Sequence, residues 1–232
     1  MNSKITILAL LLITILFSCK NEAQFTNYKY ADKPAGFTCE GVNQKLLNEA
    51  LYSFEDDITK HYNKNVKNPR LEQAYSQIIR NSVYGRLKLE DIISKHTINV
   101  FNALKNESDL WDANNTKSHL NYKGKILKCI ANNIKDKNLK TTLNALISTN
   151  SMAPKLFGPT IISKYRNVLS DKNLAMYIAL DLFYAKFFDL DLTTINTDKP
   201  EKKVDLNKAP AKTEVDTHAD HNHNHSHAGH SH

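Results

Sequence analysis

The sequence predicts an all-α protein: a single bundle of about six or seven helices followed by a disordered, histidine-rich C-terminal tail. Between residues 42 and 189, apolar residues recur at steps of three and four, which is the spacing of one helix face. No run alternates β-branched with polar residues and no hairpin turn signal occurs, so nothing favours a sheet. From Thr193 onward the chain lacks the apolar residues that a packed core requires.

Three helices are predicted in the first half of the bundle. The first covers residues 42–63, and the second begins at Asn68-Pro69, a pair suited to an N-cap and first turn. Gly85 is placed to end that helix in a left-handed cap. The third covers residues 89–105. Their apolar faces are formed by Leu47, Leu51, Phe54, Ile58 and Tyr62, then Leu71, Ala74, Tyr75, Ile78, Ile79 and Val83, then Leu89, Ile92, Ile93, His96, Val100 and Leu104.

The second half repeats this pattern with shorter helices. Residues 106–118 lack a period and are predicted to form a loop around Trp111. A fourth helix is expected from Leu120 to Ile134, with His119 at its start as a cap or surface residue. A short fifth helix carries Leu139, Leu143, Leu146 and Ile147.

The last two helices follow a predicted turn at residues 151–158 that contains Pro154. Gly158-Pro159 is expected to open the sixth helix, which continues to Leu169. Ser170-Asp171 is a plausible cap for the seventh, residues 173–189. The sequence of this helix is apolar almost all round, which places it in the middle of the bundle.

Asp181 interrupts that apolar helix. A buried carboxylate must be paired or protonated, and we expect Arg80, Arg86 or Arg166 to satisfy it. A ligand-binding or proton-transfer role is the alternative.

Length and composition favour one domain in the body of the chain. Without its two ends, the chain retains roughly 170 residues, enough for one core and too few to require two. The predicted divisions are a signal peptide at 1–18, a lipidated cysteine and spacer at 19–38, the helical domain at 39–192 and the tail at 193–232.

The N-terminal segment has the order of a secretory signal. Lys4 provides the positive charge, and residues 5–17 are apolar apart from two threonines. This run is too short to span a bilayer comfortably, since spanning needs about 20 apolar residues. Cleavage is therefore expected.

Leu16-Phe17-Ser18-Cys19 resembles the lipobox of bacterial lipoprotein precursors, although Phe17 stands where a smaller residue is usual. The resemblance covers only this segment and implies that Cys19 is acylated, so that the protein is anchored to a membrane of the cell envelope. Lys20 stands where some lipoproteins carry the aspartate that retains them in the inner membrane, which favours the outer membrane and leaves both its periplasmic and its surface face open. An ordinary signal peptide is the alternative.

Two further cysteines, Cys39 and Cys129, remain in the predicted mature chain. Export would place them where disulfides persist, so a bridge between them is one reading and two buried free thiols are the other. Neither lies in a Cys-x-x-Cys pattern, so no redox or haem motif is present.

The tail carries the strongest chemical signal in the sequence. Imidazole is a ligand for Zn, Ni and Cu, and a flexible chain can fold three or four rings around one ion. The segment is similar to histidine-rich segments of zinc, nickel and copper handling proteins, which implies capture, buffering or delivery of a divalent ion. Small residues interrupt the histidines, unlike the usual purification tag. The expected ligands are His218, His221, His223, His225, His227, His230 and His232.

Other functions have little support. The formal charge of +7 lies in the body, where lysines alternate with acidic residues as on a solvated surface, and no nucleic-acid motif occurs. No catalytic motif of the common hydrolase, zinc-protease or phosphate-loop types is found, so no enzyme is predicted. In the body, Asp57 and His61 lie four residues apart on one helix face and could provide two metal ligands, but no further ligands are indicated by the sequence.

Two functions remain. In the first, an envelope-anchored lipoprotein binds divalent metal ions through its tail. In the second, the helical body is an interaction scaffold for another envelope protein, and the metal affinity of the tail is incidental.

Overall fold

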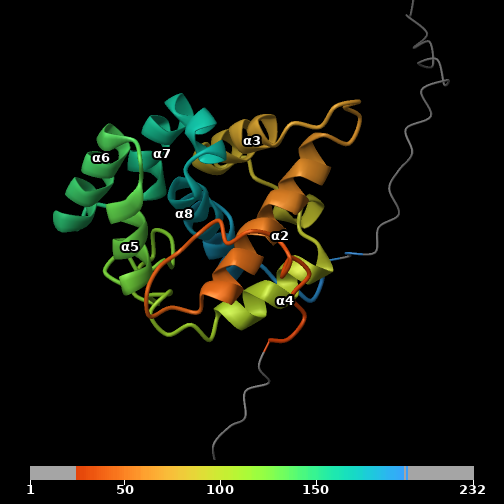
Figure 1. Cartoon of the computed structure of the whole chain (residues 1–232), viewed down its shortest axis with the longest axis horizontal. Coiled ribbons are helices and arrows are strands. Elements are labelled where there is room, and N and C mark those ends of the chain that lie inside the picture. The colour runs from red at the N-terminus through yellow and green to blue at the C-terminus, as the bar shows by residue number, and fades with distance from the viewer. Residues whose placement is uncertain (1–24, 196, 198–232) are drawn as a thin grey trace, which may run out of the picture. The chain divides into compact units, whose positions relative to one another are not determined.

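The computed structural model describes residues 25–195 and residue 197, and this part of the chain is all-α (Figure 1). It contains seven α-helices and three short 3-10 helices, with no strand beyond one isolated bridge between Trp111 and Leu120. With the labels of Figure 1, the α-helices are α2 (Gln44–Tyr62), α3 (Leu71–Val83), α4 (Lys95–Leu104), α5 (Lys125–Asn133), α6 (Lys137–Ser148), α7 (Pro154–Ser163) and α8 (Lys172–Leu182), and the 3-10 helices are η1 (Leu89–Asp91), η2 (Tyr165–Leu169) and η3 (Tyr184–Asp189).

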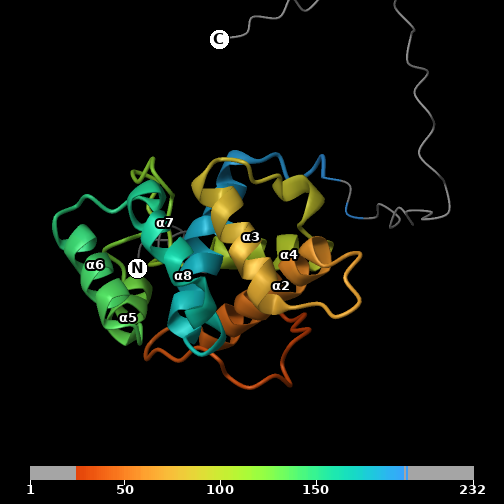
Figure 2. The ribbon, with the colours of Figure 1, turned by 90° about the horizontal axis from the view of Figure 1, so that it is seen from above.

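Helix α8 occupies the centre, as its apolar sequence predicts. Every residue from Leu174 to Leu182 is buried. Figures 1 and 2 show α2, α3 and α4 on one side of it and α5 and α6 on the other, with α7 packed against both α3 and α6. Direct packing of α8 on α2, α3 and α5 joins the two groups around one core.

Several predicted helix ends are confirmed by their capping contacts. The Asp171 carboxylate accepts hydrogen bonds from the backbone N–H groups of Asn173 and Leu174 at the start of α8. Gly85 has φ +67° just after α3, where a left-handed residue closes the helix. The cap expected at Asn68-Pro69 is wrong, because α3 begins at Leu71.

The third and seventh predicted helices are each divided. Residues 89–105 form η1 and then α4, because the Ser94 hydroxyl caps α4 by accepting a hydrogen bond from Thr97 N–H. Residues 173–189 form α8 and then η3, with a non-helical backbone at Phe183. Sequence periodicity persists across both breaks because both pieces face the same core.

The fourth helix begins five residues later than expected, at Lys125. His119 has φ 67°, which is incompatible with a helix start, and residues 121–124 form a turn. Gly124 is required at the end of that turn, since a Cβ there would lie 2.3 Å from the carbonyl oxygen of Asp109. The loop around Trp111 therefore extends to residue 124.

The predicted turn at residues 151–158 is also wrong in its second half, because α7 already begins at Pro154. Pro159 then lies inside the helix. Gly158 faces α3, and a Cβ there would lie 2.4 Å from a methyl group of Val83. Gly158 thus serves close packing on α3, and Pro159, which is exposed, does not mark a helix start.

Among the described helices, none combines the length and apolarity needed to cross a lipid bilayer.

Candidate functional site

The residues with the strongest sequence signals lie outside the described part of the chain. These are Cys19, predicted to carry the lipid, and the seven histidines of the tail, His218, His221, His223, His225, His227, His230 and His232. Their expected roles remain predictions.

The other two cysteines are joined in the structure. Cys39 and Cys129 form a disulfide with a Cα–Cα distance of 6.2 Å, across 90 residues of sequence. The bond connects the segment before α2 to α5, and both residues are only partly buried. The alternative prediction, two buried free thiols, is therefore wrong.

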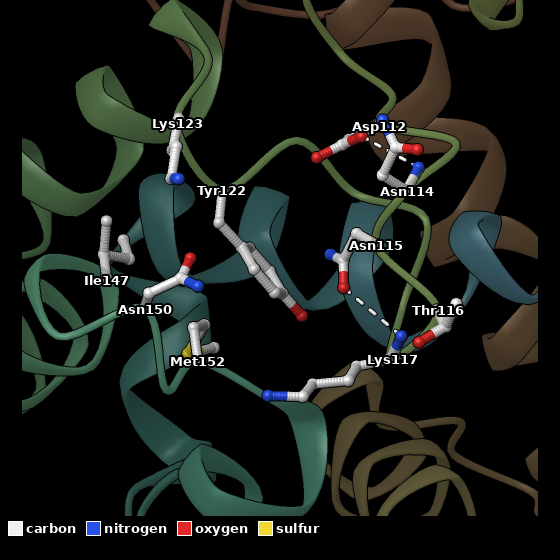
Figure 3. Close-up of a pocket in the computed structure, with 10 residues that line it drawn as sticks. All are labelled: Asp112, Asn114, Asn115, Thr116, Lys117, Tyr122, Lys123, Ile147, Asn150 and Met152. Atoms are coloured by element: carbon white, nitrogen blue, oxygen red, sulfur yellow. Dashed lines mark hydrogen bonds between the residues drawn. The ribbon is translucent and has the colours of Figure 1, made fainter.

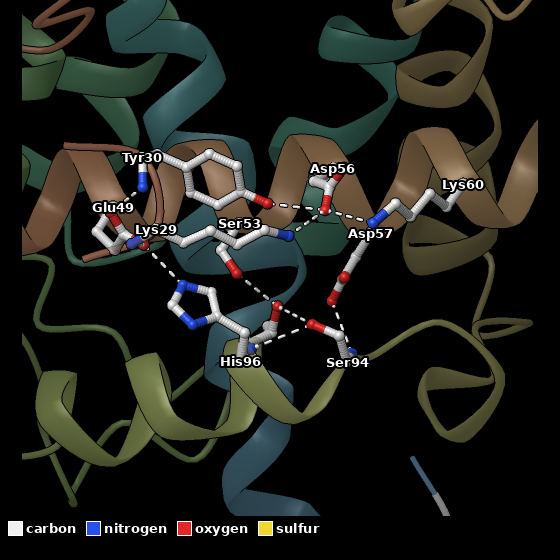
Figure 4. A network of polar contacts seen from close by, with 10 residues as sticks. Lys29, Tyr30, Glu49, Ser53, Asp56, Asp57, Lys60, Ser94 and His96 are labelled. Atoms are coloured by element: carbon white, nitrogen blue, oxygen red, sulfur yellow. Dashed lines mark hydrogen bonds and ion pairs between the residues drawn. The ribbon is translucent and has the colours of Figure 1, made fainter. Parts of the chain in front are cut away.

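Residues 25–38, predicted to be a spacer, pack against α2. Glu49, whose side chain is only 1% exposed, accepts hydrogen bonds from the backbone N–H groups of Lys29 (2.7 Å) and Tyr30 (3.0 Å). Nε2 of His96, on α4, lies 2.6 Å from the same carboxylate (Figure 4). One buried acid thus fixes the N-terminal segment to both helices. His96 is satisfied, as expected, but it lies at the edge of the core and is only partly buried.

Asp56, two helical turns after Glu49, makes a second connection to this segment. It accepts hydrogen bonds from the Tyr30 hydroxyl (2.7 Å), from Lys29 Nζ (3.1 Å) and from Lys60 Nζ (2.8 Å). Partial burial raises its pKa, but the bonds from Lys60, Tyr30 and Lys29 outweigh burial and bring the pKa to about 2. The carboxylate is therefore ionised at neutral pH, and the segment is held by charge as well as by backbone contacts.

Asp57 and His61 do not form a metal site. Asp57 accepts a hydrogen bond from Ser94 N–H (2.9 Å), and burial raises its pKa. Nδ1 of His61 lies 3.0 Å from the backbone carbonyl of Asp91, and burial lowers the pKa of His61. Within the described residues, no three His, Cys, Asp or Glu side chains gather as metal ligands.

Asp181 is fully buried and is satisfied by hydroxyl groups. Tyr177 (2.5 Å), Tyr122 (3.0 Å) and Ser118 donate hydrogen bonds to its carboxylate. Burial raises the pKa of Asp181, which the three hydroxyl donors only partly offset.

The expected arginine partners of Asp181 are wrong. Arg166, for example, pairs with Glu72 at the surface, and neither Arg80 nor Arg86 is among the groups that donate to Asp181. The three hydroxyls come from loops or from the same helix turn, which helical periodicity could not place beside Asp181.

A polar pocket of about 290 Å³ lies next to this network, and Figure 3 shows its lining residues. It is enclosed by the loop that contains Trp111 and by the turn between α6 and α7. Tyr122 connects the two sites, because its ring lines the pocket while its hydroxyl contacts Asp181. The lining residues are Asp112, Asn114, Asn115, Thr116, Lys117, Tyr122, Lys123, Ile147, Asn150 and Met152.

The sequence predicts neither the hydrogen-bond network around Glu49 nor the pocket beside Tyr122. Glu49, Ser53 and Asp56 recur at helical spacing opposite the apolar face of α2, a pattern that normally indicates a solvated surface. Most of the pocket residues lie in loop segments that have no helical or strand periodicity, so no pattern in the sequence indicates that they come together. His119, expected as a cap or surface residue, makes an exposed contact with Asp189 across 70 residues, with Nε2 lying 3.0 Å from the carboxylate, as the surface alternative allows.

The chain matches no protein family model, and no curated protein or solved structure matches it significantly.

Proposed function

We propose that this chain is an envelope-anchored lipoprotein that binds divalent transition metal ions through its C-terminal histidine-rich tail. The observation that carries the proposal is the density of ligands in the tail. Seven histidines alternate with small polar residues over residues 218–232. Zn, Ni and Cu all accept imidazole, so the tail would capture, buffer or deliver one of these ions.

The folded domain supports an extracytoplasmic location for this activity. The Cys39–Cys129 disulfide suits an oxidising compartment such as the one that a signal peptide would give access to. A reducing cytosol would not preserve it. The lipobox-like sequence at Cys19 provides a second, independent argument for this location.

The docked N-terminal segment would also keep the domain close to the membrane. Only residues 20–24 separate Cys19 from Phe25, where the described chain begins. Six residue steps span at most about 22 Å when fully extended. Because Glu49 and Asp56 hold the chain from Lys29 onward, the anchor would connect to the domain by a short tether.

The lipid anchor is tested by replacing its only candidate attachment point. Cys19→Ala should abolish incorporation of labelled palmitate and leave an unprocessed or soluble product, because the thioether requires the cysteine sulfur. Cys129→Ser is the matched control, since it removes a cysteine without touching the lipobox and should still be labelled. Unchanged labelling of Cys19→Ala would remove the lipoprotein assignment.

The second candidate is a helical scaffold for another envelope protein. It is favoured by large apolar side chains that remain exposed at neighbouring helices, such as Tyr84 (58%) after α3 and Leu156 (57%) in α7.

Growth under metal excess and under metal starvation distinguishes the metal-binding function from the scaffold function. A strain lacking residues 213–232 should share the metal phenotype of the full deletion if the tail is the functional part. A phenotype only in the full deletion, independent of metal, would favour the scaffold.

A further inference from the structure

We propose that the pocket beside Tyr122 binds a small anionic ligand that carries several hydroxyl groups, such as a sugar acid or a sugar phosphate. This site is separate from the histidine tail and from the anchor, and the inference does not depend on the proposed function. It rests on the volume and net charge of the pocket, on exposed polar side chains there that have no partner among the described residues, and on walls fixed by hydrogen bonds.

The charge of the pocket favours an anion. Lys117 and Lys123 approach it from different parts of the same loop. Figure 3 shows the amino group of Lys123 directed toward the space between Tyr122 and Asn150, and that of Lys117 on the other side of the pocket near Met152. Neither amino group has a hydrogen-bond or ion-pair partner among the described residues. Two lysines face one aspartate, Asp112, so the lining carries a net positive charge.

Its neutral groups favour hydroxyls on the same ligand. The side-chain amide of Asn150 has no partner within the described chain and can both donate and accept. One oxygen of Asp112 accepts from Asn114 N–H (2.9 Å), which leaves the other able to accept from a hydroxyl. The ring of Tyr122 and the side chains of Ile147 and Met152 provide an apolar surface for the carbon skeleton.

The walls of the pocket are held in place before any ligand arrives. Asn150 has φ 54°, a left-handed conformation that closes α6, and its backbone N–H bonds to Ile147 O at 3.0 Å. On the opposite wall, the Asn115 amide donates to Leu120 O at 2.7 Å. The Tyr122 hydroxyl is fixed by Asp181 from within the core. Such preorganisation lowers the ordering cost of binding.

The volume of about 290 Å³ lies at the lower end of the range for small-molecule sites. A ligand of one sugar ring therefore fits this site better than a long polymer or a peptide. The openness of the pocket to solvent also suits a hydrophilic ligand.

The test is a calorimetric titration of the full-length protein, freed of metal, with glucuronate and with glucose 6-phosphate. Glucose and inorganic phosphate serve as the neutral and the hydroxyl-free probes. At least one anionic sugar should bind more tightly than either control. Tighter binding of glucuronate would show that the site prefers a carboxylate, and tighter binding of glucose 6-phosphate would show that it prefers a phosphate.

Two variants locate the binding. Lys117→Gln/Lys123→Gln should weaken it by about tenfold or more, because each charged hydrogen bond contributes more than a neutral one. Lys128→Gln/Lys155→Gln removes the same charge from exposed positions outside the pocket and should leave the affinity unchanged. Asn150→Gly, which permits the same positive φ, should weaken binding without loss of helicity.

The proposal is overturned if neither anionic sugar binds, or if glucose binds as tightly as both of them. It is also overturned if phosphate alone matches glucose 6-phosphate, or if both lysine pairs reduce the affinity equally. Circular dichroism of each variant establishes that the fold is retained.

Discussion

Replacing Cys39 and Cys129 together by serine is expected to lower the free energy of unfolding by up to about 4–5 kcal/mol. The bond closes a loop with a sequence separation of 90 residues, and the unfolded chain gains most of its freedom when such a long loop is opened. The loss is large against a typical total stability of about 5–15 kcal/mol. Urea denaturation of the wild type and of the double variant measures the difference directly.

The control for this experiment is the wild type in the presence of a reducing agent, which should show the same loss. The reduced wild type and the serine variant share an open loop but differ in the side chains at both positions. Mass analysis without reduction should find neither Cys39 nor Cys129 alkylated. Two alkylatable thiols in the mature protein, or a loss below about 1 kcal/mol, would contradict the bridge.

Asp181→Ala is expected to cost roughly 3 kcal/mol or more of stability. The substitution leaves the hydroxyls of Ser118, Tyr122 and Tyr177 without their common acceptor, and a buried unpaired polar group costs about 1–3 kcal/mol. It also opens a cavity in the centre of the bundle. Thermal or urea unfolding followed by circular dichroism measures the effect.

The matched variant Asp181→Asn preserves the shape and isolates the charge. Burial raises the pKa of Asp181 in the folded state above its unfolded value, so the folded state binds this proton more tightly. The resulting stabilisation is fully present below the unfolded pKa of 3.8 and is lost as pH rises through the folded pKa. The wild type should therefore lose stability relative to Asp181→Asn as pH rises. A stability difference that is constant with pH would show that the carboxyl titrates alike in both states.

Much of the fold could be predicted because the outer helices bury a regular apolar face and α8 is apolar on nearly all sides. The stripes of α2, α3 and α8, and the Asp171 cap, follow from spacing and from local hydrogen bonding. The breaks at Ser94 and Phe183 could not be predicted in this way, because the apolar pattern continues through them. The breaks are caused by the Ser94 cap and by the non-helical backbone at Phe183, while the apolar surface on either side of each break stays continuous.

The sites were harder to predict than the fold because they join distant segments. Glu49 and Tyr30 lie 19 residues apart, and Ser118 and Asp181 lie 63 apart. The sequence indicates that the buried acid in α8 needs partners and favours arginines for this role. It does not indicate that hydroxyl groups, two of them from a loop, provide the hydrogen bonds. His119 and Asn150 both have a positive φ and shape that loop and the pocket. Neither is a glycine, so the sequence does not indicate the left-handed backbone at these positions.

The histidine tail differs from these sites because its signal is entirely local. Its rings are competent ligands above their unperturbed pKa of about 6.5, so metal binding should be lost as pH falls below about 6. The Irving–Williams order places Cu(II) above Ni(II) and Zn(II), so affinity in vitro would not identify the biological ion.

Calorimetric titration of Zn(II) at about pH 7.5 into the full chain and into a chain lacking residues 213–232 tests the metal-binding proposal most directly. With three or four rings per ion, the full chain should bind about one or two ions, and the truncated chain none. A full-length control with the seven tail histidines replaced by asparagine should match the truncated chain, and all three should have the same helicity. Stoichiometric Zn(II) binding by the truncated chain would contradict the proposal and place the metal site in the helical domain.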